Sequence, residues 1–131
     1  MRNVRIKLFR LILGATGICE MLLGLSIIFF ATQLQSYFAT GWLYEPLNLR
    51  ILGMMDFFIG AIYFQISRRP DYYRILNKGT AYLRLGLSLV FFAEGFFLLE
   101  QGRLRVVYQF LTIFDFFLFA IQTTYLRKSM K

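Results

Sequence analysis

Histidine is absent from the sequence, and cysteine occurs once, as Cys19, among 131 residues. Histidine-ligated haem and zinc sites and His-based catalytic triads are therefore excluded. A single thiol also excludes an intrachain disulfide and a cysteine cage for a metal, and we expect Cys19 to be a small buried side chain. No glycine-rich phosphate loop or metal-ligand spacing is present. We therefore expect no catalytic residue, no metal site and no intrinsic cofactor, and we do not expect the chain to be an enzyme.

Charged residues are also scarce, at 17% of the chain, whereas soluble domains usually contain about 25%. Apolar residues make up 58% and occur in long runs, which rules out a water-soluble fold. Four of these runs are long enough to cross about 30 Å of hydrocarbon as helices. They are residues 11–31, 51–67, 81–99 and 106–126.

The apolar runs do not alternate with polar residues, as the strands of a membrane β-barrel would. Helices are the other structure that satisfies every backbone hydrogen bond inside a bilayer. The sequence therefore predicts an all-α fold, a polytopic membrane protein in which four transmembrane helices form a bundle. Residues 1–131 are expected to be one integral membrane domain.

Basic residues lie in the gaps between the apolar runs and give the chain a net charge of +8. Twelve of the 15 belong to the N-terminal segment, the connection between the second and third runs, or the C-terminal segment. This count assigns Arg84, near the start of the third run, to that connection. The other two gaps contain only Arg50, Arg103 and Arg105. The positive-inside rule then predicts that both termini are cytoplasmic. Because a membrane surface accounts for these charges, we expect no binding to nucleic acid.

The connections between the runs differ in length and composition. Residues 32–49 form the longest, and its aromatic residues, which include Trp42 and Tyr44, are expected to lie at the headgroup level. Residues 71–78 of the middle connection are predicted to form a short surface helix. The connection around residues 101–104 is short, so the third and fourth helices are expected to form an antiparallel hairpin.

Two segments that begin with aspartate are similar, DFFIGAI from Asp56 and DFFLFAI from Asp115, and an arginine follows each aspartate by twelve residues. An arginine also precedes an acidic residue by ten residues at Glu20, Glu94 and Asp115. Both patterns are consistent with a duplicated helical hairpin, and chance similarity between Phe-rich helices is the alternative. A duplication would concern the history of the fold more than its activity.

Each predicted helix contains one carboxylate, and these are Glu20, Asp56, Glu94 and Asp115. An ionisable side chain near the bilayer centre costs about 2.5–3.5 kcal/mol on insertion scales, so such residues mark functional or structural contacts. At about 1.5 Å per residue, all four can lie within one slab of the membrane. We expect them to converge in the bundle core without an obvious partner of opposite charge at the same depth, although Arg50, Arg84 and Arg105 can extend from the helix ends.

The first two acids each lie between two glycines. The motifs have one spacing and read Gly17-x-x-Glu20-x-x-x-Gly24 and Gly53-x-x-Asp56-x-x-x-Gly60. Residues three and four apart share a helix face, and small residues let membrane helices approach closely. We therefore expect the four glycines to be helix-packing residues. The acids are interpreted as a polar clamp between helices, as a site for a cation, a proton or a basic group of a ligand or partner, or as groups that face outward toward another protein.

The segments GICEMLLGL (residues 17–25) and GMMDFFIG (residues 53–60), in a compact four-helix chain, resemble the DoxX-like group of small bacterial membrane proteins. That group includes subunits associated with quinone-linked thiosulfate oxidation. The resemblance implies an accessory membrane subunit rather than a self-contained catalyst. It also implies a location in the bacterial cytoplasmic (inner) membrane.

Two functions fit these observations. The first is a non-catalytic accessory or structural subunit that docks through its helices, with the lipid bilayer and a larger membrane protein complex or further copies of the chain as partners. The alternative is a small transporter, a proton or cation pathway, or a protein that binds lipid or quinone with its intramembrane carboxylates. The 16 Phe and eight Tyr residues suit a bound lipid, quinone or pigment, although contact with lipid explains them equally well.

Overall fold

The computed structural model describes residues 2–38, 46–98 and 103–128, and every element in these ranges is helical. The elements are α1 (Arg2–Phe29), α2 (Ala31–Phe38), α3 (Pro46–Arg68), α4 (Arg74–Ala93), the π-helical turn η2 (Glu94–Leu98) and α5 (Arg103–Lys128). The all-α prediction is therefore confirmed. By length and composition, α1, α3, α5 and the continuous helix formed by α4 and η2 can each cross a membrane, so we describe the chain as an integral membrane protein.

The helices begin earlier in the chain than the apolar runs do. α1 starts at Arg2, α3 at Pro46 and α4 at Arg74, because backbone hydrogen bonding continues beyond the part of a helix that hydrocarbon surrounds. Pro46 suits the first turn of α3, where its missing N–H has no partner to lose. The predicted surface helix over residues 71–78 is wrong, since residues 74–78 are the first turns of α4.

Two of the predicted connections lie partly outside the described residues. Of the segment 32–49, residues 32–38 belong to α2 and residues 46–49 to α3, whereas Trp42 and Tyr44 are outside the described ranges. The prediction that these aromatic residues lie at the headgroup level therefore stays a prediction. The connection around residues 101–104 also falls largely outside, with α5 beginning at Arg103.

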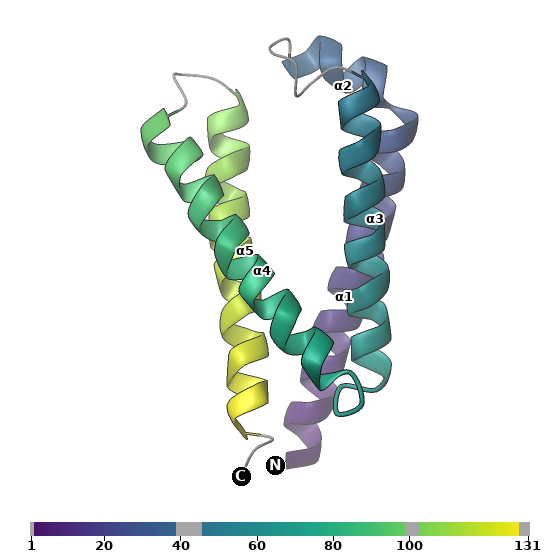
Figure 1. Ribbon diagram of the computed structural model, residues 1–131, viewed down its shortest axis with the longest axis vertical. Coiled ribbons are helices and arrows are strands. Elements are labelled where there is room, and N and C mark those ends of the chain that lie inside the picture. The colour runs from purple at the N-terminus through teal and green to yellow at the C-terminus, as the bar shows by residue number, and fades with distance from the viewer. Residues whose placement is uncertain (1, 39–45, 99–102, 129–131) are drawn as a thin grey trace. The chain divides into compact units, whose positions relative to one another are not determined.

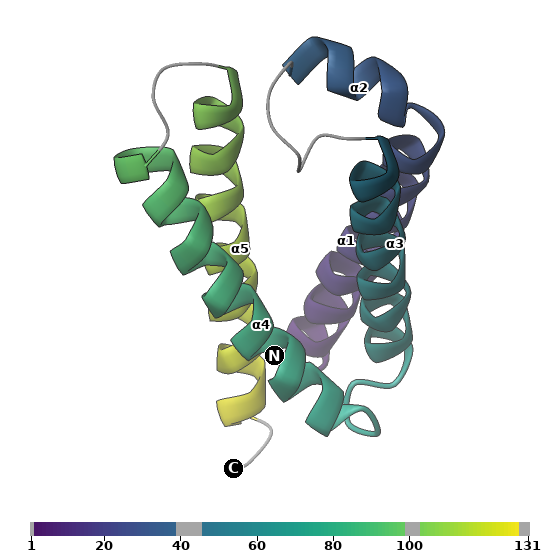
Figure 2. The ribbon, with the colours of Figure 1, turned by 45° about the horizontal axis from the view of Figure 1, so that its top comes forward.

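The chain divides into two units, and the first, Met1–Tyr73, contains α1, α2 and α3. Here α1 and α3 run side by side in opposite directions, while α2 turns away from the axis of α1 (Figures 1 and 2). Helical hydrogen bonding continues through the bend, because Phe30 N donates to Ser26 O and Leu34 N donates to Phe30 O, both at 2.9 Å. The first unit is therefore a helical hairpin with a short helix at one end.

The second unit, Arg74–Lys131, contains α4, η2 and α5. Its two long helices are antiparallel and cross at an angle, as Figure 1 shows. The π turn η2 prolongs α4 at the end where the chain approaches α5. Each unit thus has one pair of long antiparallel helices, which is the arrangement that a duplicated hairpin would produce.

Polar and apolar side chains are distributed in the reverse of a water-soluble protein. Half of the side chains described as buried are polar or charged, and those on α4 and α5 include Asn77, Arg84, Ser88, Asp115 and Gln122. The exposed side chains include many leucines, isoleucines and phenylalanines of all four long helices. Since hydrocarbon solvates apolar side chains and leaves polar ones to pair internally, this distribution suits a bilayer.

Candidate functional site

The four candidate carboxylates are shared equally between the two units. Glu20 of α1 and Asp56 of α3 belong to the first unit, and Glu94 of η2 and Asp115 of α5 belong to the second. Asp115 and Glu20 are buried, with 1% and 6% of their surface exposed. Asp56 and Glu94 are partly exposed. Each unit therefore has one buried acid and one that is partly exposed.

Glycine residues form the contact between α1 and α3 in the first unit. A Cβ atom added to Gly17 would lie 2.6 Å from the carbonyl oxygen of Gly60, and one added to Gly60 would lie 2.5 Å from that of Gly17. Gly24 and Gly53 meet in the same way, at 2.5 and 2.7 Å. Real Cβ atoms do not approach backbone oxygens so closely, so both crossings need glycine on each helix.

These two glycine contacts relate α1 and α3 by an approximate twofold axis. Gly17 of α1 meets Gly60 of α3, and Gly24 of α1 meets Gly53 of α3. A rotation that exchanges the two helices therefore places Gly17 on Gly53 and Gly24 on Gly60, which in both cases are 36 residues apart. Glu20 and Asp56 are also 36 residues apart. A twofold axis perpendicular to two antiparallel helices keeps equivalent residues on the same face and reverses their positions along the helices. Glu20 and Asp56 each lie about midway between their two glycines, close to the axis. The two acids therefore lie at about one level and on one face of the hairpin.

In the second unit, Asp115 has a cationic partner. Arg84 Nη1 donates to Asp115 Oδ1 at 2.5 Å, and the two side chains are 6% and 1% exposed. The expectation that the acids lack a partner of opposite charge within the span is therefore wrong for Asp115, which Arg84 contacts. The assignment of Arg84 to a loop is also wrong, because Arg84 lies inside α4, ten residues after its first residue. A buried charge is tolerated here because the opposite charge is in direct contact.

Further polar contacts join α4 to α5 on the side of this ion pair nearer the start of α4. The Gln122 amide donates through Nε2 to Asn77 Oδ1 and to Thr80 Oγ1, both at 2.9 Å. On the other side, Ser88 Oγ donates to the backbone oxygen of Thr112 at 2.9 Å. Polar contacts therefore extend along the interface between α4 and α5 on both sides of the ion pair. Neither Gln122 nor Asn77 was predicted from the sequence to take part in it.

A spacing signal for these residues is nevertheless present in the sequence. Asn77, Arg84 and Ser88 are separated by seven and four residues, and Asp115 and Gln122 by seven. Such spacings place residues on one helix face. Two adjacent helices that each have a polar face are expected to turn those faces toward one another in a membrane.

Glu94 lies away from Asp115. It follows Arg84 by ten residues, which is about 15 Å along a helix, and Arg84 is the residue that contacts Asp115. Next to Glu94, the carbonyl oxygen of Gly95 accepts hydrogen bonds from Arg105 Nε at 3.2 Å and Gln109 Nε2 at 3.3 Å. The second unit therefore does not bring its two candidate acids, Glu94 and Asp115, together, so Asp115 is part of an ion pair with Arg84.

Two further candidate features can be placed. Cys19 is exposed, so the expectation that it is buried is wrong: it follows the exposed Ile18 on the outer face of α1. Within residues 2–38, 46–98 and 103–128, no three His, Cys, Asp or Glu side chains come together as ligands for a metal ion. Chemically, the arrangement offers two carboxylates, Glu20 and Asp56, on one face of the first hairpin and a carboxylate neutralised by Arg84 in the second.

Comparison of the chain with protein-family models, with curated proteins and with solved structures found no match. The resemblance of residues 17–25 and 53–60 to the DoxX-like group therefore stays a prediction.

Proposed function

We propose that the chain is a non-catalytic accessory or structural subunit of a larger membrane protein complex, and that it docks through the outer faces of its helices. The observation that supports this most directly is the use of polar side chains in the second unit. Arg84 contacts Asp115, and Gln122 contacts Asn77, in each case between α4 and α5. Groups that are committed to holding two helices together are not available for chemistry on a substrate.

The outer faces suit contact with other membrane helices. Exposed side chains on α4 and α5 include Leu89, Val90, Val107 and Phe110. Gly86 of α4 is exposed as well, and nothing in the described structure lies within 4 Å of a Cβ atom added there. Exposed glycine in a membrane helix permits the backbone of a neighbour to approach, so Gly86 is the position at which we propose that a partner helix docks.

The proposal is tested by isolating the protein from its native membrane in a mild detergent. We expect the chain to be recovered with other polypeptides or as an oligomer, and we expect Gly86→Leu to release it as a monomer. Leu89→Phe is the matched control, because it also enlarges an exposed position of α4 but replaces a side chain that is already bulky. Recovery of the unaltered chain as a stable monomer would count against docking.

We also propose that both termini face the cytoplasm and that the membrane is the bacterial cytoplasmic membrane. Without Arg84, eleven Lys and Arg residues flank the helices on the side of the termini, and Arg50, Arg103 and Arg105 lie on the other. The positive-inside asymmetry thus survives the reassignment of Arg84. Reporters fused after Lys131 test it: fluorescence of a cytoplasmic reporter is expected, whereas activity of a periplasmic phosphatase would reverse the orientation.

A second function, a proton or cation pathway, is favoured by the relation between Glu20 and Asp56. Their common level and face in the hairpin could present two carboxylates to one cation. In liposomes, the double variant Glu20→Gln and Asp56→Asn should then abolish proton or cation flux. Glu94→Gln is the control, since Glu94 lies in the other unit. Unchanged flux in the double variant would eliminate this function and leave the docking role unaffected.

A further inference from the structure

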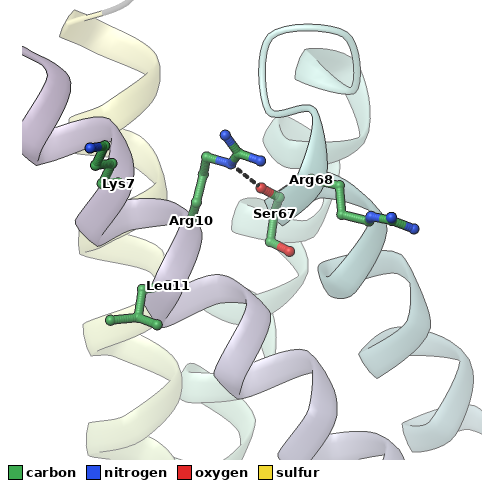
Figure 3. Close-up of a pocket in the computed structure, with 5 residues that line it drawn as sticks. All are labelled: Lys7, Arg10, Leu11, Ser67 and Arg68. Carbon is green, nitrogen blue, oxygen red and sulfur yellow. Dashed lines mark hydrogen bonds between the residues drawn. The ribbon is translucent and has the colours of Figure 1, made fainter.

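We infer that the basic end of the first unit binds the phosphate headgroup of an anionic phospholipid, in an open pocket of about 320 Å³ between α1 and α3. Figure 3 shows the five residues that line it. They are Lys7, Arg10 and Leu11 of α1 with Ser67 and Arg68 of α3. Three of the five are cationic and none is acidic, so the pocket favours an anion.

Arg10 is the centre of this site because its guanidinium is already held in place. Figure 3 shows it reaching from α1 to α3, where Nε donates to the backbone oxygen of Ser67 at 2.8 Å. That oxygen is among the last four carbonyls of α3, which have no partner within their own helix. The contact uses one N–H of five, so the terminal nitrogens of Arg10 remain to bind oxygen atoms of a phosphate.

The neighbouring cations lie on either side of Arg10. Lys7 precedes it by about one turn on α1, and Arg68 follows Ser67 on α3. Figure 3 shows the Arg68 side chain extending away from Arg10, and its guanidinium carbon lies 5.8 Å from the centroid of the Phe64 ring. Lys7 and Arg68 are exposed, and their long side chains have several rotatable bonds, so they can turn onto a phosphate that Arg10 has bound.

The position of the pocket along the helices favours a lipid over a soluble phosphate. Leu11 is the first residue of the apolar run 11–31, and Arg68 is the last residue of α3. The pocket thus has a cationic rim and one apolar lining residue, Leu11, at the start of the apolar run, where headgroups meet acyl chains in a bilayer. A ligand with an acidic head and an apolar tail matches both parts, whereas inorganic phosphate matches only the rim.

The test measures binding of single lipids to the full-length protein in neutral detergent micelles by native mass spectrometry. Micelles have no surface potential, so general attraction of basic residues to a charged membrane does not contribute. We expect phosphatidylglycerol or cardiolipin to bind at least about tenfold more tightly than phosphatidylcholine, which corresponds to about 1.4 kcal/mol. Equal affinity for anionic and neutral lipids would overturn the site.

Variants then locate the binding. Arg10→Gln should weaken the anionic lipid about tenfold, and Arg5→Gln, an exposed arginine of α1 outside the pocket, is the matched control with an expected change below about twofold. If Arg10→Gln does not fold, Lys7→Gln with Arg68→Gln replaces it, because both side chains are exposed. Equal losses from the pocket and control variants would show attraction without a site and would overturn the inference.

A final arm distinguishes the source of the phosphate. Inorganic phosphate is titrated into the lipid-bound protein, and the anionic lipid is expected to remain bound because Leu11 and, further along α1, the exposed Ile18 and Leu22 can contact its acyl chains. Displacement of the lipid by millimolar phosphate would show that the rim alone determines binding. That result would overturn the assignment to a lipid.

Discussion

Arg84 of α4 and Asp115 of α5 form a buried ion pair, with 2.5 Å between Nη1 and Oδ1. The pair joins the two long helices of the second unit, 31 residues apart in sequence. Neutralisation by contact explains how α4 can hold an arginine and α5 an aspartate within apolar spans. The same contact removes Asp115 from the set of acids that a cation pathway could use.

Breaking this pair on one side should destabilise the second unit severely. We expect Arg84→Met or Asp115→Leu alone to lower the free energy of unfolding by about 3–5 kcal/mol, because each leaves a buried charge without its partner. The double variant should recover most of that loss, since neither charge remains. Unfolding in detergent, followed by circular dichroism as a double-mutant cycle, measures the coupling. Additive losses in the double variant would show that the pair is not the reason for the effect.

The glycine crossings predict a different kind of sensitivity in the first unit. Gly17→Ala places a Cβ 2.6 Å from the carbonyl oxygen of Gly60, so α1 and α3 must move apart, at about 1–3 kcal/mol. Gly79→Ala is the control, because an added Cβ there has open space and alanine favours a helix by about 1 kcal/mol over glycine. The melting temperatures of the two variants in detergent should therefore shift in opposite directions. A loss of stability in both would refute the crossing as the cause.

The helical spans could be predicted from the sequence because length and hydropathy alone determine which segments hydrocarbon can surround. The beginnings of the helices could not, since α1 already includes Arg2 and α4 already includes Arg74. Hydropathy reports the solvent around a segment, whereas a helix ends where its backbone hydrogen bonding ends. The surface helix predicted over residues 71–78 failed for this reason.

The sequence predicts which helices contain an acid, but it predicts less well which side chains the acids contact. Counting the basic residues by side assigns Arg84 to the middle connection although it lies within the apolar run 81–99, and the structure places it inside α4 in contact with α5. That contact joins two helices, so no local pattern in either one specifies it. The polar spacing that includes Asn77, Arg84 and Ser88 was the available signal, and hydropathy averaging over the same residues conceals it.

Gln122 provides a test of the polar face that this spacing defines. Its amide donates to both Asn77 and Thr80 and is completely buried, so Gln122→Leu should remove two hydrogen bonds between α4 and α5. We expect a loss of about 1–3 kcal/mol in the free energy of unfolding. Thr124→Val is the control, because Thr124 is exposed and its hydroxyl contacts only Ala120 O within α5. Equal effects of the two variants would contradict a role for the interhelical contact.

Cys19 tests directly whether the outer face of α1 meets lipid. The thiol is exposed on α1. Its neighbours Ile18 and Leu22 are also exposed, by 44% and 59%. In intact liposomes a lipid-soluble maleimide should label Cys19. A charged maleimide should react at least about tenfold more slowly there, since a charge entering hydrocarbon costs about 2.5 kcal/mol or more.

The control is the double variant Cys19→Ser with Tyr72→Cys, in which the one thiol lies outside the spans. Tyr72 is 76% exposed and lies between α3 and α4, so the charged reagent should label it readily from the aqueous phase on its side of the bilayer. Comparable rates for the charged reagent at positions 19 and 72 would place the outer face of α1 in water. Because the exposed apolar side chains of α1 are explained only by lipid or a protein partner, that result would remove the basis for both the membrane assignment and the proposed docking.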